Sequence, residues 1–317
     1  MYKIKEKPDD FIVKEVSDLK LKELGKYAVC ILKKKNYTTM RAVSQIANAL
    51  MIKAKDIGFA GIKDKSAVTE QFISVKSVDK GRLIKFKLKD ISLEFKGYSN
   101  NPISLGDLKE NEFIITVKAI DTKKIKKLEK NKKFLMPNLF GEQRFSKNNV
   151  AIGKLLLKGD FKNALNLILK TNPDCKDEIK KSIKKNLNDF VGALKLMPKK
   201  LLILYVHAYQ SYLWNICLEE YVKTNTKNIE IPLIGFGTED MDKKVEKIIE
   251  DIMEKENVSF RSFINRSMPD ISLEGGLRNA FIEIKNFEIL EKGKDFVKIK
   301  FRLSKGSYAT EAVKFLF

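Results

Sequence analysis

A single aspartate lies between two lysines within residues 58–72, an arrangement of charges that is suited to chemistry. Lys63 and Lys65 flank Asp64, and neighbouring cations favour the ionised form of a carboxyl group. An ionised carboxylate on a loop at a strand end can act as a nucleophile or as a base. A solvated Lys-Asp-Lys turn is an ordinary surface feature as well, so these three residues alone leave both interpretations open.

A second candidate segment, residues 136–145, has the sequence MPNLFGEQRF. Its proline and glycine indicate a loop. Phenylalanine can stack on a nucleotide base, asparagine and glutamine can bond to base edges, and arginine can bind phosphate. An ordinary aromatic turn can have the same composition, so the segment is a candidate for binding a nucleotide and no more.

The chain has one histidine, His207, which shares a helical stripe with Ser211 and Asn215. No second histidine is present to share a metal, and a packed, hydrogen-bonded histidine is therefore the expected role. The cysteines are far apart and form no CxxC pair: Cys30, Cys175 and Cys217. This cysteine usage favours a reduced, cytoplasmic setting.

The charge of the chain is strongly positive and uneven along the sequence. The 317 residues include 62 Lys and Arg against 41 Asp and Glu, a net charge of +21. Residues 1–152 carry +15 (33 − 18), residues 153–285 carry +3 (22 − 19), and residues 286–317 carry +3 (7 − 4). A one-sided basic balance indicates a polyanion such as nucleic acid, although a lysine-rich solvated surface gives the same total.

Arginine is rare in this lysine-rich background, which makes each arginine a candidate for a geometric role, since lysine lacks its planar fork. The seven are Arg41, Arg82, Arg144, Arg261, Arg266, Arg278 and Arg302. No segment reaches the roughly 18 apolar residues of a membrane span, and the first residues contain no apolar signal-peptide core. We therefore expect no membrane association.

The hydrophobic pattern predicts strands in both outer parts of the chain and helices between them. The expected strands cover residues 27–33, 84–88, 91–95, 112–119, 281–284 and 296–301. The most apolar expected helix covers residues 201–222. This order predicts a helical domain, residues 153–285, inserted into a sheet domain made of residues 1–152 and 286–317, since domain termini commonly lie close together.

Three blocks of the sequence resemble the signature blocks of the TruD-type pseudouridine synthases: GFAGIKDKSAVTEQ (58–71), MPNLFGEQRF (136–145) and GSYAT (306–310). The segments PDDFIVKE (8–15) and HAYQSYLWN (207–215) are similar to further parts of that family. The resemblance runs from about residue 5 to residue 313 and is loose over 220–280. It implies an α+β fold: a mixed, mainly antiparallel-sheet pseudouridine synthase catalytic domain with an inserted, helix-rich TRUD domain.

The resemblance also implies an activity, the isomerisation of a uridine in RNA to pseudouridine, with uridine 13 of tRNA as the expected target. Asp64 matches the catalytic aspartate, expected to be the nucleophile, and Lys5 matches its basic partner. The expected substrate-binding residues are Phe11, Lys63, Asn138, Phe140, Arg144 and Tyr308. Tyr308 stands where the family often has phenylalanine, so its hydroxyl departs from the pattern.

The implied partners are tRNA and other RNAs, bound by a monomer in the cytoplasm, with no metal, no cofactor and no membrane. A non-catalytic RNA-binding protein with the same basic surface is the alternative function. The two differ at Asp64, which an enzyme needs and a binding protein does not. A methyltransferase would need a Gly-rich cofactor loop after an early strand, and the sequence contains no convincing one.

Overall fold

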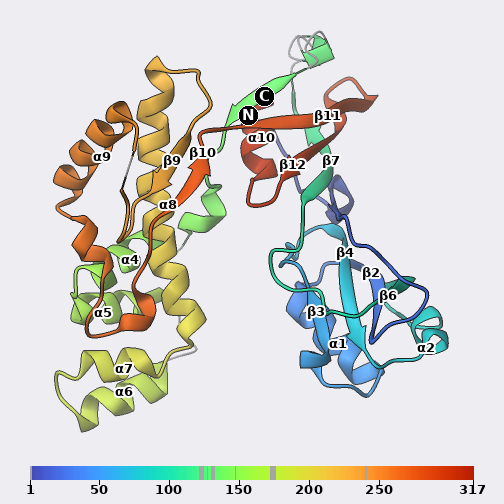
Figure 1. The fold of residues 1–317 in the computed structure, drawn as a ribbon, viewed down its shortest axis with the longest axis horizontal. Coiled ribbons are helices and arrows are strands. Elements are labelled where there is room, and N and C mark those ends of the chain that lie inside the picture. The colour runs from blue at the N-terminus through green and yellow to red at the C-terminus, as the bar shows by residue number, and fades with distance from the viewer. Residues whose placement is uncertain are drawn as a thin grey trace. The chain divides into compact units, whose positions relative to one another are not determined.

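The structure is a computed structural model, shown in Figure 1. It describes residues 2–120, 125–126, 128–129, 133–146, 148–171, 176–239 and 241–317. The chain divides into two compact units: unit 1 contains residues 1–136 and 283–317, and unit 2 contains residues 137–282. Unit 1 is therefore formed by two stretches of chain that are separated in the sequence by the whole of unit 2.

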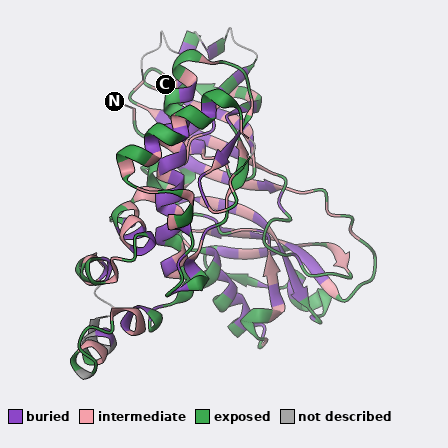
Figure 2. Cartoon of the chain, turned by 60° about the vertical axis from the view of Figure 1, so that its left-hand side comes forward, coloured by how far each residue is buried: buried purple, intermediate pink, exposed green. Residues whose placement is uncertain are grey.

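A ten-stranded, mainly antiparallel sheet forms the centre of unit 1. Its strands are β1 (Phe11–Val16), β2 (Tyr27–Lys35), β3 (Ile57–Phe59), β4 (Val68–Lys76), β5 (Lys87–Leu88), β6 (Ile91–Ser99), β7 (Glu110–Lys118), β8 (Phe134–Pro137), β11 (Phe281–Lys292) and β12 (Phe296–Ser304). The strand order is β5-β6-β2-β4-β1-β7-β12-β11-β8, with β3 beside β4. Buried and less buried residues alternate along β1 and β12, as expected for strands with one packed face. Figure 2 shows the chain coloured by burial.

The central strands β1 and β4 bring distant parts of the sequence to the same end of the sheet. Strand β1 pairs in parallel with β4, with Ile12 opposite Val68, and pairs antiparallel with β7. Because parallel neighbours begin at the same end of a sheet, the segment before β1 and the loop before β4 lie at the same end. This topology brings the N-terminal segment close to the loop that contains Asp64.

The helices of unit 1 whose bounds lie fully within the described residues are α1 (Thr39–Ala49), α2 (Lys80–Ile84) and α10 (Ala309–Leu316). The Thr38 hydroxyl accepts a hydrogen bond from the backbone N–H of Arg41 and thereby caps α1. Val43 and Ile46 of α1 belong to the same buried cluster as Leu32 of β2 and Ile73 of β4. The helix therefore packs on the strands that flank the Asp64 loop.

Unit 2 is mainly helical and is organised around one long helix, α8 (Figure 1). Its described elements are α4 (Asn149–Leu157), α5 (Phe161–Thr171), α6 (Lys176–Lys185), α7 (Phe190–Lys195), α8 (Lys199–Thr224), α9 (Lys243–Glu256) and the antiparallel pair β9 (Glu230–Leu233) and β10 (Gly276–Asn279). Trp214, Tyr205 and Tyr209 of α8 are almost completely buried in the core of the unit.

The boundaries of the two units differ from those predicted from the sequence. The divisions lie at 136/137 and 282/283, instead of 152/153 and 285/286. Residues 137–152 belong to unit 2 because the short 3-10 helix Glu142–Phe145 and helix α4 both pack against α8. Helix α4 approaches α8 so closely that a Cβ atom at Gly153 would lie 2.1 Å from the carbonyl oxygen of Tyr205.

Candidate active site

The loop that connects β3 to β4 carries Asp64. The two strands pair antiparallel, so the loop closes a hairpin at the end of the sheet where β1 begins. The Oδ2 atom of Asp64 lies 2.7 Å from Nζ of Lys5, and the two side chains are 42% and 18% exposed. The ion pair that the resemblance implies is therefore present in unit 1, and it is accessible to solvent.

Lys5 has an unusual backbone conformation, and its side chain packs against an aromatic ring. Its φ of 58° lies in the left-handed region, which costs a non-glycine residue about 1–2 kcal/mol. Reciprocal backbone hydrogen bonds between Lys3 and Lys118 attach this segment to β7. The Lys5 ammonium lies 4.0 Å from the centroid of the Phe11 ring, and Phe11 is buried. Phe11 thus contacts Lys5 directly.

Lys63 points into the protein rather than into solvent. Its Nζ atom lies 2.7 Å from Oε1 of Glu15, and the two side chains are 7% and 2% exposed. The same ammonium donates to Oδ1 of Asn111 at 2.9 Å, and the backbone N–H of Lys63 donates to the Thr39 hydroxyl at 2.9 Å. The other oxygen of Glu15 accepts the backbone N–H of Phe72 in β4 at 2.8 Å. This buried network attaches the residue before Asp64 to β1, β4, β7 and α1.

A second buried lysine contacts Asp64 itself. The Nζ atom of Lys34 donates to the backbone carbonyl of Asp64 at 3.0 Å and to that of Tyr37 at 2.6 Å. Burial lowers the pKa of Lys34 to about 8, whereas the negative charge of Asp64 raises this pKa and the positive charge of Lys63 lowers it further. The loop is therefore held between a cation at its backbone and a cation at the Asp64 side chain.

In unit 2, the loop that follows β8 is fixed at Asn138. Arg278 of β10 donates from Nε and Nη2 to the Asn138 carbonyl at 3.1 and 3.0 Å, and from Nη2 to Oδ1 of Asn138 at 2.6 Å. The amide of Asn138 donates to the carbonyl of Asn279 at 3.1 Å, and Nε1 of Trp214 donates to the Asn138 carbonyl at 3.4 Å. Asn138 is buried, so its side chain and carbonyl belong to the internal framework of unit 2.

Phe140, two residues further on, is fixed through its backbone. Its N–H donates to Oδ1 of Asn215, whose amide nitrogen donates back to the Phe140 carbonyl, each at 2.9 Å. The guanidinium carbons of Arg278 and Arg144 lie 4.2 and 5.4 Å from the centroid of the Phe140 ring. The ring is half-buried and electrostatically attracted to these cations.

Arg144 also contacts helix α8. Its Nε donates to the hydroxyl of Ser211 at 3.1 Å, and this hydroxyl donates to the carbonyl of His207 at 2.8 Å. Burial lowers the pKa of His207, and the positive charge of Arg144 adds to this effect. His207 is therefore a half-buried neutral residue of the helix, in line with the packed role expected from its isolation in the sequence.

Taken together, the structure brings Lys5 into direct contact with both Asp64 and Phe11 within unit 1. It places Asn138, Phe140 and Arg144 on one loop of unit 2. Tyr308 of unit 1 is half-buried and immediately precedes α10. Among the residues that the structure describes, no group of three or more His, Cys, Asp or Glu side chains is suited to hold a metal ion.

Three residues for which no site role was predicted support the Phe140 loop: Arg278, Asn215 and Trp214. Arg278 was one of seven arginines whose rarity was the signal, but nothing in the sequence chose it from the others. Asn215 shared a helical stripe with His207, without an indication of what it contacts. Lys34 was missed because it stands in a run of three lysines, where only the alternation of the strand separates it from Lys33 and Lys35.

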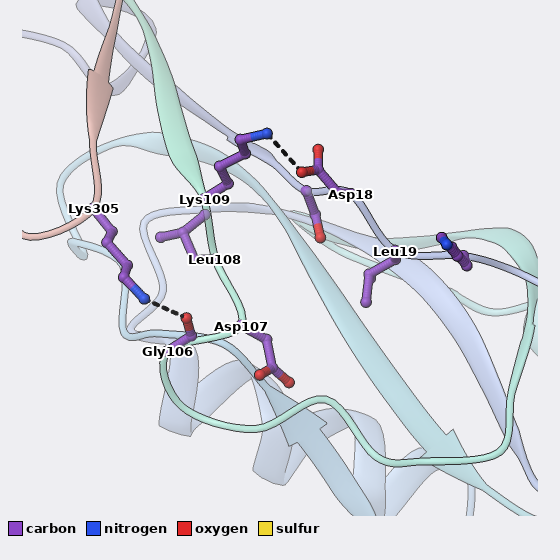
Figure 3. Close-up of a pocket in the computed structure, with 9 residues that line it drawn as sticks. Asp18, Leu19, Gly106, Asp107, Leu108, Lys109 and Lys305 are labelled. Atoms are coloured by element: carbon purple, nitrogen blue, oxygen red, sulfur yellow. Dashed lines mark hydrogen bonds and ion pairs between the residues drawn. The ribbon is translucent and has the colours of Figure 1, made fainter.

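A surface pocket of unit 1, with a volume of about 570 Å³, lies outside this arrangement (Figure 3). It contains none of the predicted site residues. Three of its charged groups have partners within the pocket, since Lys109 pairs with Asp18 at 2.6 Å and Lys305 donates to the carbonyl of Gly106 at 3.0 Å. None of the helices in the described part of the chain has the length and apolar content needed to span a membrane.

The model of one protein family, described as tRNA pseudouridine synthase D (TruD), matches residues 2–189, 175–230 and 219–314 of this chain. The chain belongs to the TruD family. This membership identifies it as an enzyme of the pseudouridine synthase class, an isomerase, in a family whose substrate is tRNA.

Individual TruD relatives match over nearly their whole length. The tRNA pseudouridine synthase D of Aquifex aeolicus is 31% identical, and the match covers 99% of this chain and 98% of the relative. A probable tRNA pseudouridine synthase D of Nanoarchaeum equitans is 30% identical, with the same coverage of 99% and 98%. A solved structure, the putative TruD of Methanosarcina mazei, is 26% identical with a TM-score of 0.74, covering 98% of this chain and 92% of that one. The mixed, mainly antiparallel fold described above is therefore that of a TruD protein.

Proposed function

We propose that this chain converts uridine 13 of tRNA to pseudouridine, acting as a cytoplasmic monomer without metal or cofactor, with Asp64 as its catalytic nucleophile. The observation that carries the proposal is the 2.7 Å ion pair between Asp64 and Lys5, on an accessible loop of a TruD family member. Lys5 is the counter-ion that keeps the carboxylate charged when a nucleotide displaces water from it.

The reaction is an isomerisation, so its atoms balance without a co-substrate. The bond between N1 of uracil and C1′ of the ribose breaks, the base rotates, and a bond between C5 and C1′ forms. C5 loses its proton and N1 gains one. The target base must first leave its stack, which costs a few kcal/mol. Stacking of the extruded base on the ring of Phe140 returns about 1–3 kcal/mol.

The remaining site residues divide into contacting and supporting groups under this proposal. Phe140 and Tyr308 offer aromatic faces to the nucleotide, and Arg144 offers a guanidinium to a phosphate. Lys63 and Asn138 have buried side chains with internal partners, so we assign both to holding their loops instead of contacting RNA. Phe11 acts by fixing Lys5, whose ammonium lies against its ring.

The decisive experiment compares wild type with Asp64→Asn on tRNA, mapping pseudouridine by carbodiimide derivatisation and primer extension. Loss of the reacting carboxylate should lower product formation by about 10³-fold or more, while tRNA affinity stays within a few-fold. Asp18→Asn is the matched control, because it removes a carboxylate from another accessible lysine pair of unit 1. Wild-type product formation by Asp64→Asn would refute the catalytic role and favour the RNA-binding alternative.

The target nucleotide is tested separately. A tRNA transcript with cytidine at position 13 should yield no pseudouridine, and uridines elsewhere in the same transcript should stay unmodified. Pseudouridine at another position would retain the enzyme class and overturn the assignment of uridine 13. Because phosphate contacts release counterions, tRNA affinity should also fall steeply as salt increases.

A further inference from the structure

Strand β2 ends in three consecutive lysines that have different surroundings. Lys33 pairs with Glu94 at 3.1 Å, and Lys35 pairs with Asp9 at 2.6 Å. Lys34 is only 2% exposed, because successive side chains of a strand point to opposite faces of the sheet. The middle lysine is thus a buried cation between two accessible ones.

The buried ammonium of Lys34 bonds to backbone rather than to a carboxylate. Its acceptors are the carbonyl oxygens of Tyr37 at 2.6 Å and Asp64 at 3.0 Å. No carboxylate oxygen of the described residues lies within 4.0 Å of it. A buried charge is costly unless polar groups compensate it, so these two carbonyls hold the ammonium and are held by it in return. Lys34 therefore joins the end of β2 to the Asp64 loop.

The rest of the loop is held in the same manner, by buried side chains that bond to its backbone. The Thr39 hydroxyl accepts the N–H of Lys63 at 2.9 Å, and the Gln71 amide donates to the carbonyl of Gly61 at 3.1 Å. The Asp64 carboxylate, by contrast, extends outward and is 42% exposed. The position of the carboxylate consequently depends on the backbone of the loop. Lys34 is the side chain that bonds to the backbone carbonyl of Asp64.

We infer that Lys34 is a positioning residue for the reaction, which fixes the backbone of Asp64 so that the carboxylate meets Lys5 and the nucleotide. The inference rests on the proposed function of Asp64. Lys34 acts through Asp64 and not on the RNA, because its ammonium is buried beneath the loop. Removing it should slow the chemical step without weakening tRNA binding, since small displacements of a reacting group cost up to about 10²-fold in rate.

The inference predicts that the titration of Lys34 affects the pH dependence of kcat. Burial lowers the pKa of Lys34 to about 8. The charged groups that act on it are Asp64 and Lys63, both from the loop between β3 and β4. Its cross-strand neighbours, Thr69 of β4 and Ile91 of β6, are uncharged, and Arg41 of α1 lies over the ring of Tyr37 at 5.3 Å.

The sign of the pH effect follows from the charge of the ammonium. Below pH 8 Lys34 is a cation with three donors, and it holds the Asp64 carbonyl through charge-assisted bonds. As the pH rises through 8, it becomes a neutral amine whose bonds are weaker. The kcat should therefore decrease above about pH 8, toward the value of a variant that lacks the ammonium.

The test measures kcat, KM and their pH dependence from pH 6.5 to 9.5 for wild type, Lys34→Met and Lys33→Met on the same tRNA. Lys34→Met should lower kcat about 10- to 100-fold at pH 7, with KM within about 3-fold, and should lose the decrease above pH 8. Lys33→Met is the matched control one residue away. A hydrogen bond to Glu94 raises the pKa of Lys33, so the control should keep the wild-type kcat and the wild-type decrease.

Two outcomes overturn the inference: wild-type kcat in a folded Lys34→Met, or a wild-type profile that is flat from pH 7 to 9.5. If Lys34→Met does not fold, Lys34→Gln keeps an uncharged amide NH2 group as donor, and the wild-type profile still decides. The proposed function fails separately, if Asp64→Asn retains activity. An inactive Asp64→Asn beside a fully active Lys34→Met would refute only the role of Lys34.

Discussion

The Asp64 loop of unit 1 and the Phe140 loop of unit 2 are held by the same kind of contact, with different cations. In each, a cation donates to the backbone carbonyl of a site residue: Lys34 to Asp64, and Arg278 to Asn138. The lysine can lose its charge in the physiological range once buried, whereas the arginine stays charged at every relevant pH. The difference makes the carboxylate loop sensitive to pH and the aromatic loop insensitive to it.

The two loops also differ in what they present. Asp64 is a small charged group in an accessible ion pair, whereas Phe140 is a half-buried ring beside two guanidinium groups. A reacting carboxylate needs access together with a fixed backbone. A stacking ring needs a fixed plane, which the two bonds between Asn215 and the Phe140 backbone provide. In both loops the backbone is fixed, and the functional side chain stays at least partly exposed.

The largest effect is expected from breaking the buried pair that holds the Asp64 loop. Glu15→Ala should lower the free energy of unfolding of unit 1 by about 3–5 kcal/mol, because it leaves the Lys63 ammonium buried without its carboxylate. Urea unfolding followed by far-UV circular dichroism measures this change. The double variant with Lys63→Met should recover part of the loss, while Asp18→Ala, at an exposed pair, should cost below about 1 kcal/mol. A loss in Glu15→Ala no larger than that of Asp18→Ala would contradict the prediction.

The next largest effect concerns the counter-ion of the carboxylate. Lys5→Met should lower kcat about 10²-fold, equivalent to about 2.7 kcal/mol, because Asp64 then lacks the charge that stabilises it in a desolvated site. Lys5→Arg, which retains the charge, should recover part of this loss. The measurement is single-turnover pseudouridine formation at saturating enzyme. Equal rates for Lys5→Met and wild type would show that the ion pair has no part in the chemistry.

A smaller effect is expected from exchanging the cation of unit 2. Arg278→Lys keeps the charge but loses the planar fork that reaches the carbonyl and Oδ1 of Asn138 together. The kcat/KM should decrease about 10-fold, a change of about 1.4 kcal/mol. Arg261→Lys, at an exposed arginine of the same unit, is the control and should be neutral. A neutral Arg278→Lys would remove the parallel between the two loops.

A further effect is the pH dependence of stability, which distinguishes the two units. Burial lowers the pKa of both His207 and Lys34, so for each group the unfolded chain binds more protons than the folded one. Stability therefore rises with pH in both windows, by at most about 1.4 kcal/mol per pH unit and group. For His207 the contribution is present above about pH 6.5 and is lost as the pH falls below it. For Lys34 the rise lies between about 8 and the ordinary lysine value of 10.5.

The two windows can be measured separately, because the only tryptophan, Trp214, is buried in unit 2. Its fluorescence reports the unfolding of unit 2, and amide hydrogen exchange reports unit 1. His207→Gln should remove the lower window, and Lys34→Met the upper one. An upper window that persists in Lys34→Met would assign the titration to another group.

Local patterns predicted much of the fold, but not the pairing of the strands. β-Branched and apolar content predicted a strand at residues 27–33, and β2 covers Tyr27–Lys35. The apolar run at 201–222 lies within α8, Lys199–Thr224. The parallel pairing of β1 with β4 joins segments about 56 residues apart (Val68 and Ile12), and no local pattern encodes such a contact. The first domain boundary was displaced because the loop before α4 packs on α8, another contact distant in sequence.

The site residues that lie in recognisable sequence motifs were predicted, and the residues that support them from elsewhere in the chain were not. The pairing of Asp64 with Lys5 came from the family resemblance, since the adjacent Lys63 looked like the obvious counter-ion. Lys63 proved to be buried with Glu15 because its side chain points inward, toward β1. Arg278 holds Asn138 from a distance of 140 positions in the sequence, and composition alone did not distinguish it from six other arginines.

The lysine run of β2 also bears on how the sheet assembles. If β2 slipped by one residue against β4, the faces would exchange, because side chains alternate with a period of two. Lys33 and Lys35 would enter the core without Glu94 and Asp9, and Cys30 and Leu32 would face outward. Burying two unpaired ammonium groups costs several kcal/mol each. The run therefore disfavours a one-residue slip of β2 against β4, since the native register places only Lys34 inside, where it bonds to two backbone carbonyls.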